Sequence, residues 1–345
     1  AWNEDSPPLA ASRVVTNRPA DSDRVRKLIL NCPLPPGDVV VLTAAVRDLH
    51  RRYPGKFLTD VRTHHPHIWS FNPYLTPICD SDQEAETIDC HYPLISESNQ
   101  LPHHFLDGYI DYLNRKLSLE VRLTEFRGDI HLRVDERTAP TLLEERFGYR
   151  GRYWLVAAGG KRDFTIKWWD QKRYQQVVNW FAGRVQFVQV GAAGDFHPEL
   201  DGVLDLRGRT DLRQLIRLIY HADGVICPVT SLMHLAAAVP TPSGDRLRPC
   251  IVVAGGREPA HWEAYPGHQF LHTIGLLRCC ATGGCWLTRT SGSRASWPLS
   301  RRAGGLSSSA GRRTGRAKGG RSWNARRSVR WGTPEVATAT RARQT

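Results

Sequence analysis

Apolar positions in the first part of the chain alternate between strand-like runs and helix-like spacing. A short apolar run predicts a strand at residues 25–31, helical spacing predicts a helix at 39–53, and a further run predicts a strand at 57–63. The Pro-Gly pair at 54–55 ends the helix between them. Strand, helix and strand in this order are typical of a parallel sheet.

A second series of the same kind begins after residue 150. Strands are expected at 153–158, 185–190 and 250–254, and a helix at 171–181. Between the two series, residues 64–135 are rich in His and aromatic residues and alternate little. This middle segment is expected to line a cleft rather than build a sheet.

Residues 203–240 form the most complete unit of the chain. Leu212, Leu215, Ile216 and Ile219 recur at helical spacing, residues 224–227 are a short apolar run, and 232–238 are again typical of a helix. The loop between that strand and helix carries Thr230 and Ser231 where a helix dipole begins. Hydroxyl groups and free backbone N–H groups at such a place are how α/β proteins hold phosphate.

Three motifs within this unit resemble glycosyltransferase family 9, the ADP-heptose:lipopolysaccharide heptosyltransferases. They are Gly-Arg-Thr-Asp-Leu at 208–212, Ala-Asp-Gly-Val-Ile at 222–226 and Met-His-Leu-Ala-Ala-Ala at 233–238. Where the family has Asp-Ser-Gly-Pro, this chain has Val-Thr-Ser-Leu at 229–232, so the acidic residue is absent.

The resemblance implies the GT-B fold, an α/β architecture in which two Rossmann-like, doubly wound domains face a cleft. We expect four regions: a flexible leader at 1–24, an acceptor-side domain at 25–150 that ends in a linker at 136–150, a nucleotide-sugar-binding domain at 151–286, and a disordered basic tail at 287–345. Ligands then lie between the domains, beyond the carboxyl ends of the strands.

The function that the resemblance implies is that of an inverting glycosyltransferase. It would move a heptose or a related sugar from a nucleotide-diphosphate sugar to a saccharide, lipopolysaccharide core or protein hydroxyl, and it would require no cofactor. The missing acidic residue at Val229 leaves a second hypothesis open, a protein of the same fold that binds sugar nucleotides without catalysis. A nucleotide-sugar epimerase would need further acid/base carboxylates, which the sequence does not identify.

Asp38 is the candidate general base. It follows the first strand in a Pro-Gly-Asp loop, and by the resemblance its carboxylate would take the proton of the acceptor hydroxyl. The structural alternative is that Asp38 caps the helix that begins there, since Asp is a favoured capping residue.

Lys167 is the second catalytic candidate. It lies in Lys-Trp-Trp at 167–169, which resembles a Lys-x-Trp-Pro signature of the family, and it would neutralise charge on the leaving diphosphate. Lys161 and Arg162 in the same loop are more typical of solvated side chains.

Other candidate site residues come from the loops around these motifs. The residues predicted to bind the donor are Gly159, Gly160, Thr230, Ser231, Met233, His234 and Glu258. Glu258 belongs to a Gly-Gly-Arg-Glu-Pro segment at 255–259 that resembles a further family loop. His104 is the candidate acceptor ligand. The histidines at 64, 65 and 67 lack a carboxylate or cysteine at ligand spacing, so a surface loop is the expectation there.

Charge is concentrated at the C-terminal end. Residues 287–345 hold 13 arginines and one lysine against a single acidic residue, which accounts for the whole net charge of +13. A tail of this composition cannot bury enough apolar surface to order itself. The favoured explanation is out-of-frame translation after Trp286; an Arg/Gly-type RNA-binding arm with Trp297, Trp323 and Trp331 is the alternative. No specific nucleic-acid partner is expected.

Cysteine spacing and hydropathy indicate the cellular compartment in which the protein is expected. Eight scattered cysteines do not form the disulfide framework of a small secreted protein, and no apolar run is long enough to span a membrane. We expect a cytoplasmic protein, with contact at the inner face of the membrane left open. Cys279, Cys280 and Cys285 supply three of the four ligands of a metal knuckle, so no closed metal site is expected.

Overall fold

A computed structural model describes residues 24–276 except 93, 99–100 and 245. All of these belong to one compact unit, Ala1–Trp297. Residues 1–23 of the predicted leader, the whole predicted tail at 287–345 and the cysteine cluster at 279–285 lie outside the described residues, so the predictions made for them are not tested. Among the described helices, none is long and apolar enough to cross a membrane.

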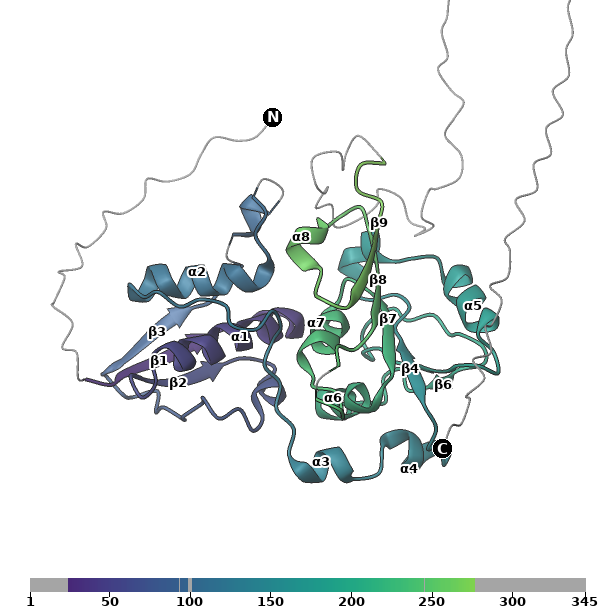
Figure 1. The fold of residues 1–345 in the computed structure, drawn as a ribbon, viewed down its shortest axis with the longest axis horizontal. Helices are drawn as coiled ribbons and strands as arrows, with labels where there is room; N and C mark the ends of the chain where they lie inside the picture. The colour runs from purple at the N-terminus through teal and green to yellow at the C-terminus, as the bar shows by residue number, and fades with distance from the viewer. Residues whose placement is uncertain (1–23, 93, 99–100, 245, 277–345) are drawn as a thin grey trace, which may run out of the picture. The chain divides into compact units, whose positions relative to one another are not determined.

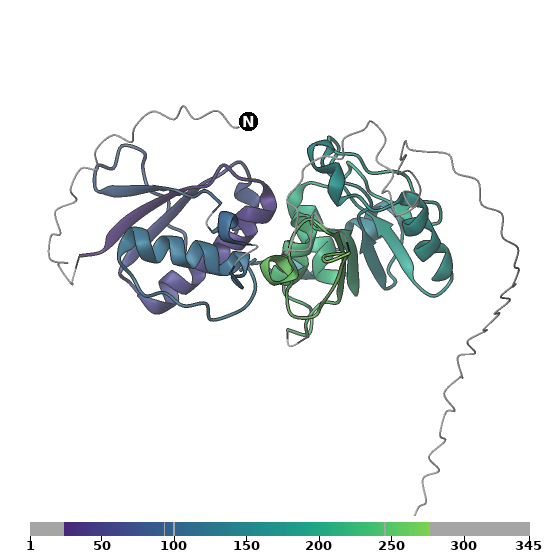
Figure 2. The ribbon, with the colours of Figure 1, turned by 90° about the horizontal axis from the view of Figure 1, so that it is seen from above.

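The N-terminal part contains a three-stranded parallel sheet. Its strands are β1 (Arg26–Asn31), β2 (Phe57–Arg62) and β3 (Ala85–Asp89), in the order β2-β1-β3. The helices α1 (Pro36–Arg52) and α2 (Phe105–Leu117) contact each other and lie side by side in both ribbon views (Figure 1, Figure 2). Along the chain, the short 3-10 helix η1 (Pro66–Trp69) follows β2, and η2 (Ile95–Glu97) lies between β3 and α2.

The prediction that the middle segment does not build a sheet is wrong for β3. Residues Ala85–Asp89 pair with β1 along its length, yet only Ile88 of this strand is buried. The strand is mostly polar because it lies at an edge of its sheet, so it has no apolar run that hydropathy could detect.

The C-terminal part contains a six-stranded parallel sheet in the order β6-β5-β4-β7-β8-β9. Its strands are β4 (Tyr153–Val156), β5 (Gln186–Gln189), β6 (Leu204–Asp205), β7 (Gly224–Pro228), β8 (Cys250–Gly255) and β9 (His268–His272). The helices are α5 (Gln171–Trp180), α6 (Leu212–His221), α7 (Ser231–Ala238) and α8 (Ala260–Glu263), with the 3-10 helix η3 (Arg162–Lys167) before α5.

The two faces of this sheet are covered by different helices. Leu155 and Val188 join the apolar core that also contains α6, α7 and α1, whereas Val156 and Phe187 pack with α5 in a smaller core. Successive residues of a strand point to opposite faces, so both faces are buried, as a doubly wound sheet requires. Figure 1 shows α6 and α7 on the opposite side of the strands from α5.

The predicted linker is partly helical. The helices α3 (Val134–Thr138) and α4 (Leu142–Phe147) occupy most of it, and Leu142 and Leu143 are buried. Arg213 of α6 ties this segment to the second sheet through an ion pair with Glu136 of α3. The linker is therefore anchored by both apolar and ionic contacts.

A fully buried ion pair anchors the middle of α1. Arg47 and Asp48 are both completely inaccessible, with Arg47 Nη2 2.9 Å from Asp48 Oδ2. The Arg47 guanidinium also donates to the carbonyls of Arg127 and Glu125, and the backbone N–H of Thr124 donates to Asp48 at 3.0 Å. The pair thus holds residues 124–127 against α1.

We predict that Arg47→Met lowers the free energy of unfolding by about 3–5 kcal/mol, because it leaves the Asp48 carboxylate buried without its cation. Chemical denaturation measures the change. Arg115→Ala is the matched control, since it breaks an exposed ion pair with Asp111 and should cost at most about 1 kcal/mol. Equal losses in the two variants would contradict the prediction.

Candidate active site

Strand order places the candidate site at two topological switch points. In the first sheet the chain continues from β1 to β2 on one side, and β3 pairs on the other side of β1; in the second, β5 and β7 flank β4 in the same way. Loops that leave neighbouring strands in opposite directions open a crevice beyond their carboxyl ends. The loops after β1, β3, β4 and β7 are therefore where ligand-binding residues belong.

Asp38 lies in the first turn of α1, because this helix begins at Pro36 and not at residue 39 as predicted, and it is next to Tyr92 in the loop after β3. Its side chain is 9% exposed, and the Tyr92 hydroxyl donates a hydrogen bond to its Oδ2 at 3.2 Å. Burial raises the pKa of Asp38 to about 6, against the opposing effects of the Tyr92 hydrogen bond and the Lys167 charge. Pro35 occupies the N-cap position of α1 without a capping hydrogen bond from its side chain, and Asp38 is three residues further on, so Asp38 is not the N-cap residue.

Gly37 lets the start of α1 approach the start of α7. A Cβ atom at residue 37 would lie 3.0 Å from Cδ2 of His234 and 3.3 Å from Cα of Ser231. Any side chain would push these helices apart. Asp38 is thereby held beside the loop after β7, which is distant from it in the sequence.

Lys167, at the end of η3, is the cation of the site. Its Nζ lies 2.7 Å from Oε1 of Glu258 and donates to the carbonyl of Val229 at 3.3 Å. Glu258 is fully buried and also forms an ion pair with Arg257. Lys167 and Arg257 both lie over the ring of Phe164, at 5.6 and 5.2 Å from its centroid. These cation–π contacts help to hold the two cations beside Glu258.

His234 takes part in a second buried network. Its Nδ1 lies 2.7 Å from the Tyr265 hydroxyl and its Nε2 lies 3.4 Å from Oε2 of Glu263. Burial lowers the pKa of His234 to about 3, and burial, aided by the negative charge of Glu258, raises the pKa of Glu263 to about 8. Near neutral pH the imidazole is uncharged and the Glu263 carboxyl group holds its proton.

Gly159 and Gly160 have a clear backbone role. Both have positive φ, and a Cβ at Gly159 would lie 2.0 Å from the carbonyl oxygen of Phe196. The Gly160 N–H donates to that carbonyl at 2.8 Å, and the Gly160 carbonyl accepts from the Phe196 N–H at 3.0 Å. The two glycines therefore join the loop after β4 to residues 192–198, and a direct contact with the donor stays a prediction.

The other predicted donor residues differ in accessibility. Thr230 occupies the capping position of α7 with its hydroxyl buried and unpartnered, and Ser231 is partly exposed in the first turn. Met233 is completely buried in the larger core. Its side chain packs in that core and offers no polar group, whereas Thr230 and Ser231 carry hydroxyl groups at this helix start.

His104 has a structural role in the protein. It is 3% exposed and caps α2, where its Nδ1 accepts from the Leu106 N–H at 3.1 Å. Its ring packs against Phe126 and Tyr265, and burial lowers its pKa to about 3. Acceptor binding by His104 stays a prediction.

Within the described ranges, no three His, Cys, Asp or Glu residues are arranged to hold a metal, the histidines at 64–67 included.

Tyr92, Glu263 and Tyr265 belong to the site although sequence patterns did not single them out, and Arg257 was noted only as part of the segment at 255–259. Tyr92 follows β3, the strand that hydropathy missed. Glu263 and Tyr265 lie at the end of a four-residue helix and beyond it, without a recognisable motif. Only their packing against His234 and His104 reveals them.

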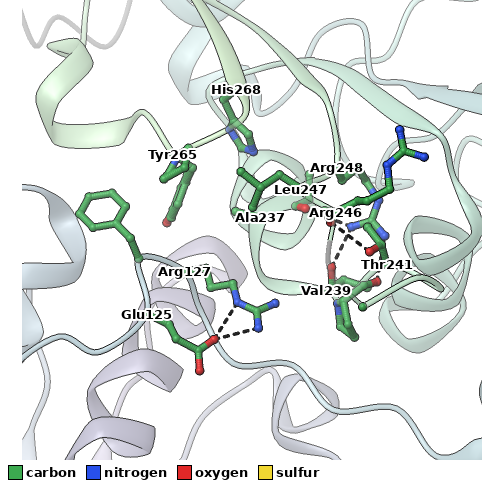
Figure 3. A pocket seen from close by; sticks show the side chains of 15 residues that line it. Glu125, Arg127, Ala237, Val239, Thr241, Arg246, Leu247, Arg248, Tyr265 and His268 are labelled. Carbon is green, nitrogen blue, oxygen red and sulfur yellow. Dashed lines mark hydrogen bonds and ion pairs between the residues drawn. The ribbon is translucent and has the colours of Figure 1, made fainter.

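The cavity in Figure 3 lies at the other end of α7. It has a volume of about 320 Å³ and is lined by residues that include Val239, Arg248 and Tyr265. Arg248 is buried there and donates to the carbonyls of Ala236 and Val239 at 3.1 and 2.8 Å, so its charge is used to satisfy the carboxyl end of that helix. This cavity is therefore separate from the helix starts at Gly37 and Ser231.

Comparisons with known proteins bear on the family resemblance and on the fold. The model of glycosyltransferase family 9 (heptosyltransferase) matches residues 132–243. A family 9 glycosyltransferase structure from Veillonella parvula DSM 2008 is 13% identical, with a TM-score of 0.54 over 73% of this chain and 87% of that chain. No curated protein sequence matches this chain.

Two E. coli structures are also similar. ADP-heptose lps heptosyltransferase II is 16% identical, with a TM-score of 0.51 over 71% of this chain and 90% of that chain. Heptosyltransferase WaaC with ADP is 15% identical, with a TM-score of 0.50 over 72% and 94% of the two chains. These similarities confirm the predicted GT-B fold.

The raised pKa of Glu263 predicts a pH-dependent stability. Its ordinary pKa is 4.5 and its folded value is about 8, so the folded state binds the extra proton between these values and stability falls as pH rises through that window. Glu263→Gln carries no such proton, and its stability should decline less. Urea denaturation from pH 5 to 8.5 measures the difference between variant and wild type. A difference that does not change with pH would contradict the protonated state.

Proposed function

We propose, from the premise that residues 132–243 carry a glycosyltransferase family 9 segment, that this chain is an inverting sugar transferase. Its donor would be a nucleotide-diphosphate sugar that carries a heptose or a related sugar. Its acceptor would be a hydroxyl group of a saccharide, a lipopolysaccharide core or a protein. The main support is the close approach of Gly37, next to Asp38, to Ser231 at the start of α7, together with the charge of Lys167, which acts on the Asp38 carboxyl group.

Asp38 is suited to act as the general base. A pKa of about 6 keeps it largely ionised at neutral pH while making it a better proton acceptor than an exposed aspartate. In the proposed step the carboxylate takes the proton of the acceptor hydroxyl as that oxygen forms a bond to the anomeric carbon. The bond from the anomeric carbon to the diphosphate oxygen breaks, and its electron pair leaves with the diphosphate.

Lys167 is suited to receive the leaving diphosphate. Its ammonium group is anchored by the Val229 carbonyl directly before the start of α7, where backbone N–H groups also favour anions. Fixed positive charge at this point stabilises the negative charge that develops as the sugar departs. In this proposal Lys167 and the start of α7 do the work that a metal ion does in other transferases, and no cofactor is required.

The rival function is sugar-nucleotide binding without transfer. Its specific support is that Lys167 is already paired with Glu258, and that Val229 stands where the family has an acidic residue. The E. coli neighbours favour a nucleotide donor in either case, because one was solved with ADP. Measurements of sugar transfer and of donor binding on the same protein distinguish these two functions.

Asp38→Asn is expected to lower the rate of transfer by about 10²-fold or more, since it removes the base and keeps the shape. Donor affinity should stay within a few-fold of wild type. Wild-type activity should rise with pH through about 6, as the Asp38 carboxyl loses its proton. Single-turnover transfer from ADP-heptose and calorimetric binding give the two readouts. Donor binding by the wild type without any turnover would support the rival function.

Lys167→Met is expected to reduce kcat by about 10²-fold, because the developing charge on the diphosphate loses its cation. Lys172→Ala is the matched control, since this exposed lysine belongs to α5. Steady-state kinetics compare the two. Similar small losses in both variants would mean that Lys167 does not contact the leaving group.

A further inference from the structure

The counter-ion of Lys167 comes from a different loop than the family motif would suggest. Val229, at the end of β7, is 3% exposed, and its side chain packs in the larger core. It offers Lys167 only a backbone carbonyl, at 3.3 Å. The carboxylate beside Lys167 is that of Glu258, which follows β8, with Oε1 at 2.7 Å. The strands β7 and β8 are parallel neighbours, so the loops that follow them lie at the same edge of the sheet. Glu258, after β8, can therefore supply beside Lys167 the negative charge that Val229, after β7, does not carry.

The two oxygens of Glu258 are used differently. Oε1 faces the ammonium of Lys167 and the guanidinium of Arg257. Oε2 is buried and has no hydrogen-bond partner among the described residues. A buried carboxylate oxygen without a donor is costly, so such an atom calls for a ligand that supplies one.

Other unpartnered groups lie in the same loops. Among the described residues, the indole Nε1 of Trp168 is buried without a hydrogen-bond partner, and the buried hydroxyl of Thr230 has no nitrogen or oxygen partner and only the Cys227 thiol beside it. Both residues lie beside Gly160, since a Cβ there would be 3.6 Å from Trp168 Nε1 and 3.9 Å from Thr230 Cγ2. The site therefore contains a buried acceptor oxygen that lacks a hydrogen-bond donor, and buried donors that lack an oxygen acceptor. A ligand that carries hydroxyl groups next to phosphates would supply both.

We propose that Glu258 replaces the acidic residue absent at position 229, and that its Oε2 accepts a hydrogen bond from a sugar hydroxyl of the donor while Oε1 holds Lys167 for the diphosphate. This proposal rests on the proposed function and assigns the specificity of that same site. The hydroxyl belongs either to the ribose or to the transferred sugar, which present the same chemistry. Glu258 is thus a specificity residue for hydroxyl-bearing diphosphates.

Three probes distinguish the proposed roles of the two carboxylate oxygens of Glu258. Pyrophosphate offers phosphates and no hydroxyl, ADP adds a ribose, and ADP-heptose adds the second sugar. Glu258→Gln should bind pyrophosphate as well as the wild type or more tightly, because Lys167 loses its competing carboxylate. Calorimetry should show a loss of about tenfold or more for the probe that carries the recognised hydroxyl, the typical size of a hydrogen bond to a charged group. A loss for ADP identifies the ribose, and a loss for ADP-heptose alone identifies the transferred sugar.

Substrate analogues test the same contact in the wild-type protein, so the result does not depend on how well the variant folds. If the ribose is recognised, 2′-deoxy-ADP or 3′-deoxy-ADP should bind about tenfold more weakly than ADP to the wild type. The same analogue should bind like ADP to Glu258→Gln, because the partner is already gone. If the transferred sugar is recognised, both deoxy analogues should bind the wild type like ADP, and the wild type's preference for ADP-heptose over ADP should vanish in the variant.

Glu199→Gln is the matched control, because it removes one negative charge from an exposed glutamate near Arg207. It should bind all three probes like the wild type. Equal weakening of pyrophosphate, ADP and ADP-heptose by Glu258→Gln, or no weakening of any, would overturn the proposal and leave the transferase function standing. Failure of the wild type to bind any of the probes would overturn both.

Discussion

The start of α1 lies against the start of α7 because residue 37 has no side chain. His234 and Ser231 approach that glycine so closely that a Cβ atom would meet them at 3.0 and 3.3 Å. Asp38 follows directly, so its place beside the second sheet is set by this contact. The loops after β4 and β8 then complete the site from one edge of that sheet, where Lys167 and Glu258 meet. A larger residue at 37 would separate the base from the cation.

Charge balance explains why the groups around this contact differ in protonation. Three buried carboxyl groups, those of Asp38, Glu258 and Glu263, share the positive charges of Lys167 and Arg257. Glu258 is in direct contact with both cations, whereas Glu263 faces a neutral histidine and keeps its proton. Burial raises the pKa of Asp38 to about 6, so this carboxyl group is largely ionised at neutral pH. One cluster of acids thereby supplies an ion-pair partner, a neutral hydrogen-bonding group and a candidate base.

Much of the fold followed from apolar periodicity, and its failures have physical causes. The helix at α1 and the unit from α6 through β7 to α7 were predicted because each buries one continuous apolar face. The edge strand β3 and the two-residue β6 were not, since neither buries enough apolar surface to leave a pattern. Asp38, Lys167 and Glu258 were identified by motif. The structure pairs Lys167 with Glu258 at one edge of the second sheet and places Asp38 in the first turn of α1, next to the start of α7. Tyr92 and Glu263 were missed because they are close to those residues only in space.

The sequence by itself determined where strands and helices alternate, and therefore which loops end at the carboxyl edge of a sheet. It also determined that Ser231 lies at a helix start and that Lys167 lies between a strand and the next helix, because local hydrophobic patterns and turn residues act over a few positions. Only the tertiary structure decided which carboxylate pairs with Lys167 and which way the pKa of each buried acid shifts. Those properties depend on burial and on charges contributed by distant segments, such as Glu258 beside Lys167, and no local pattern encodes them.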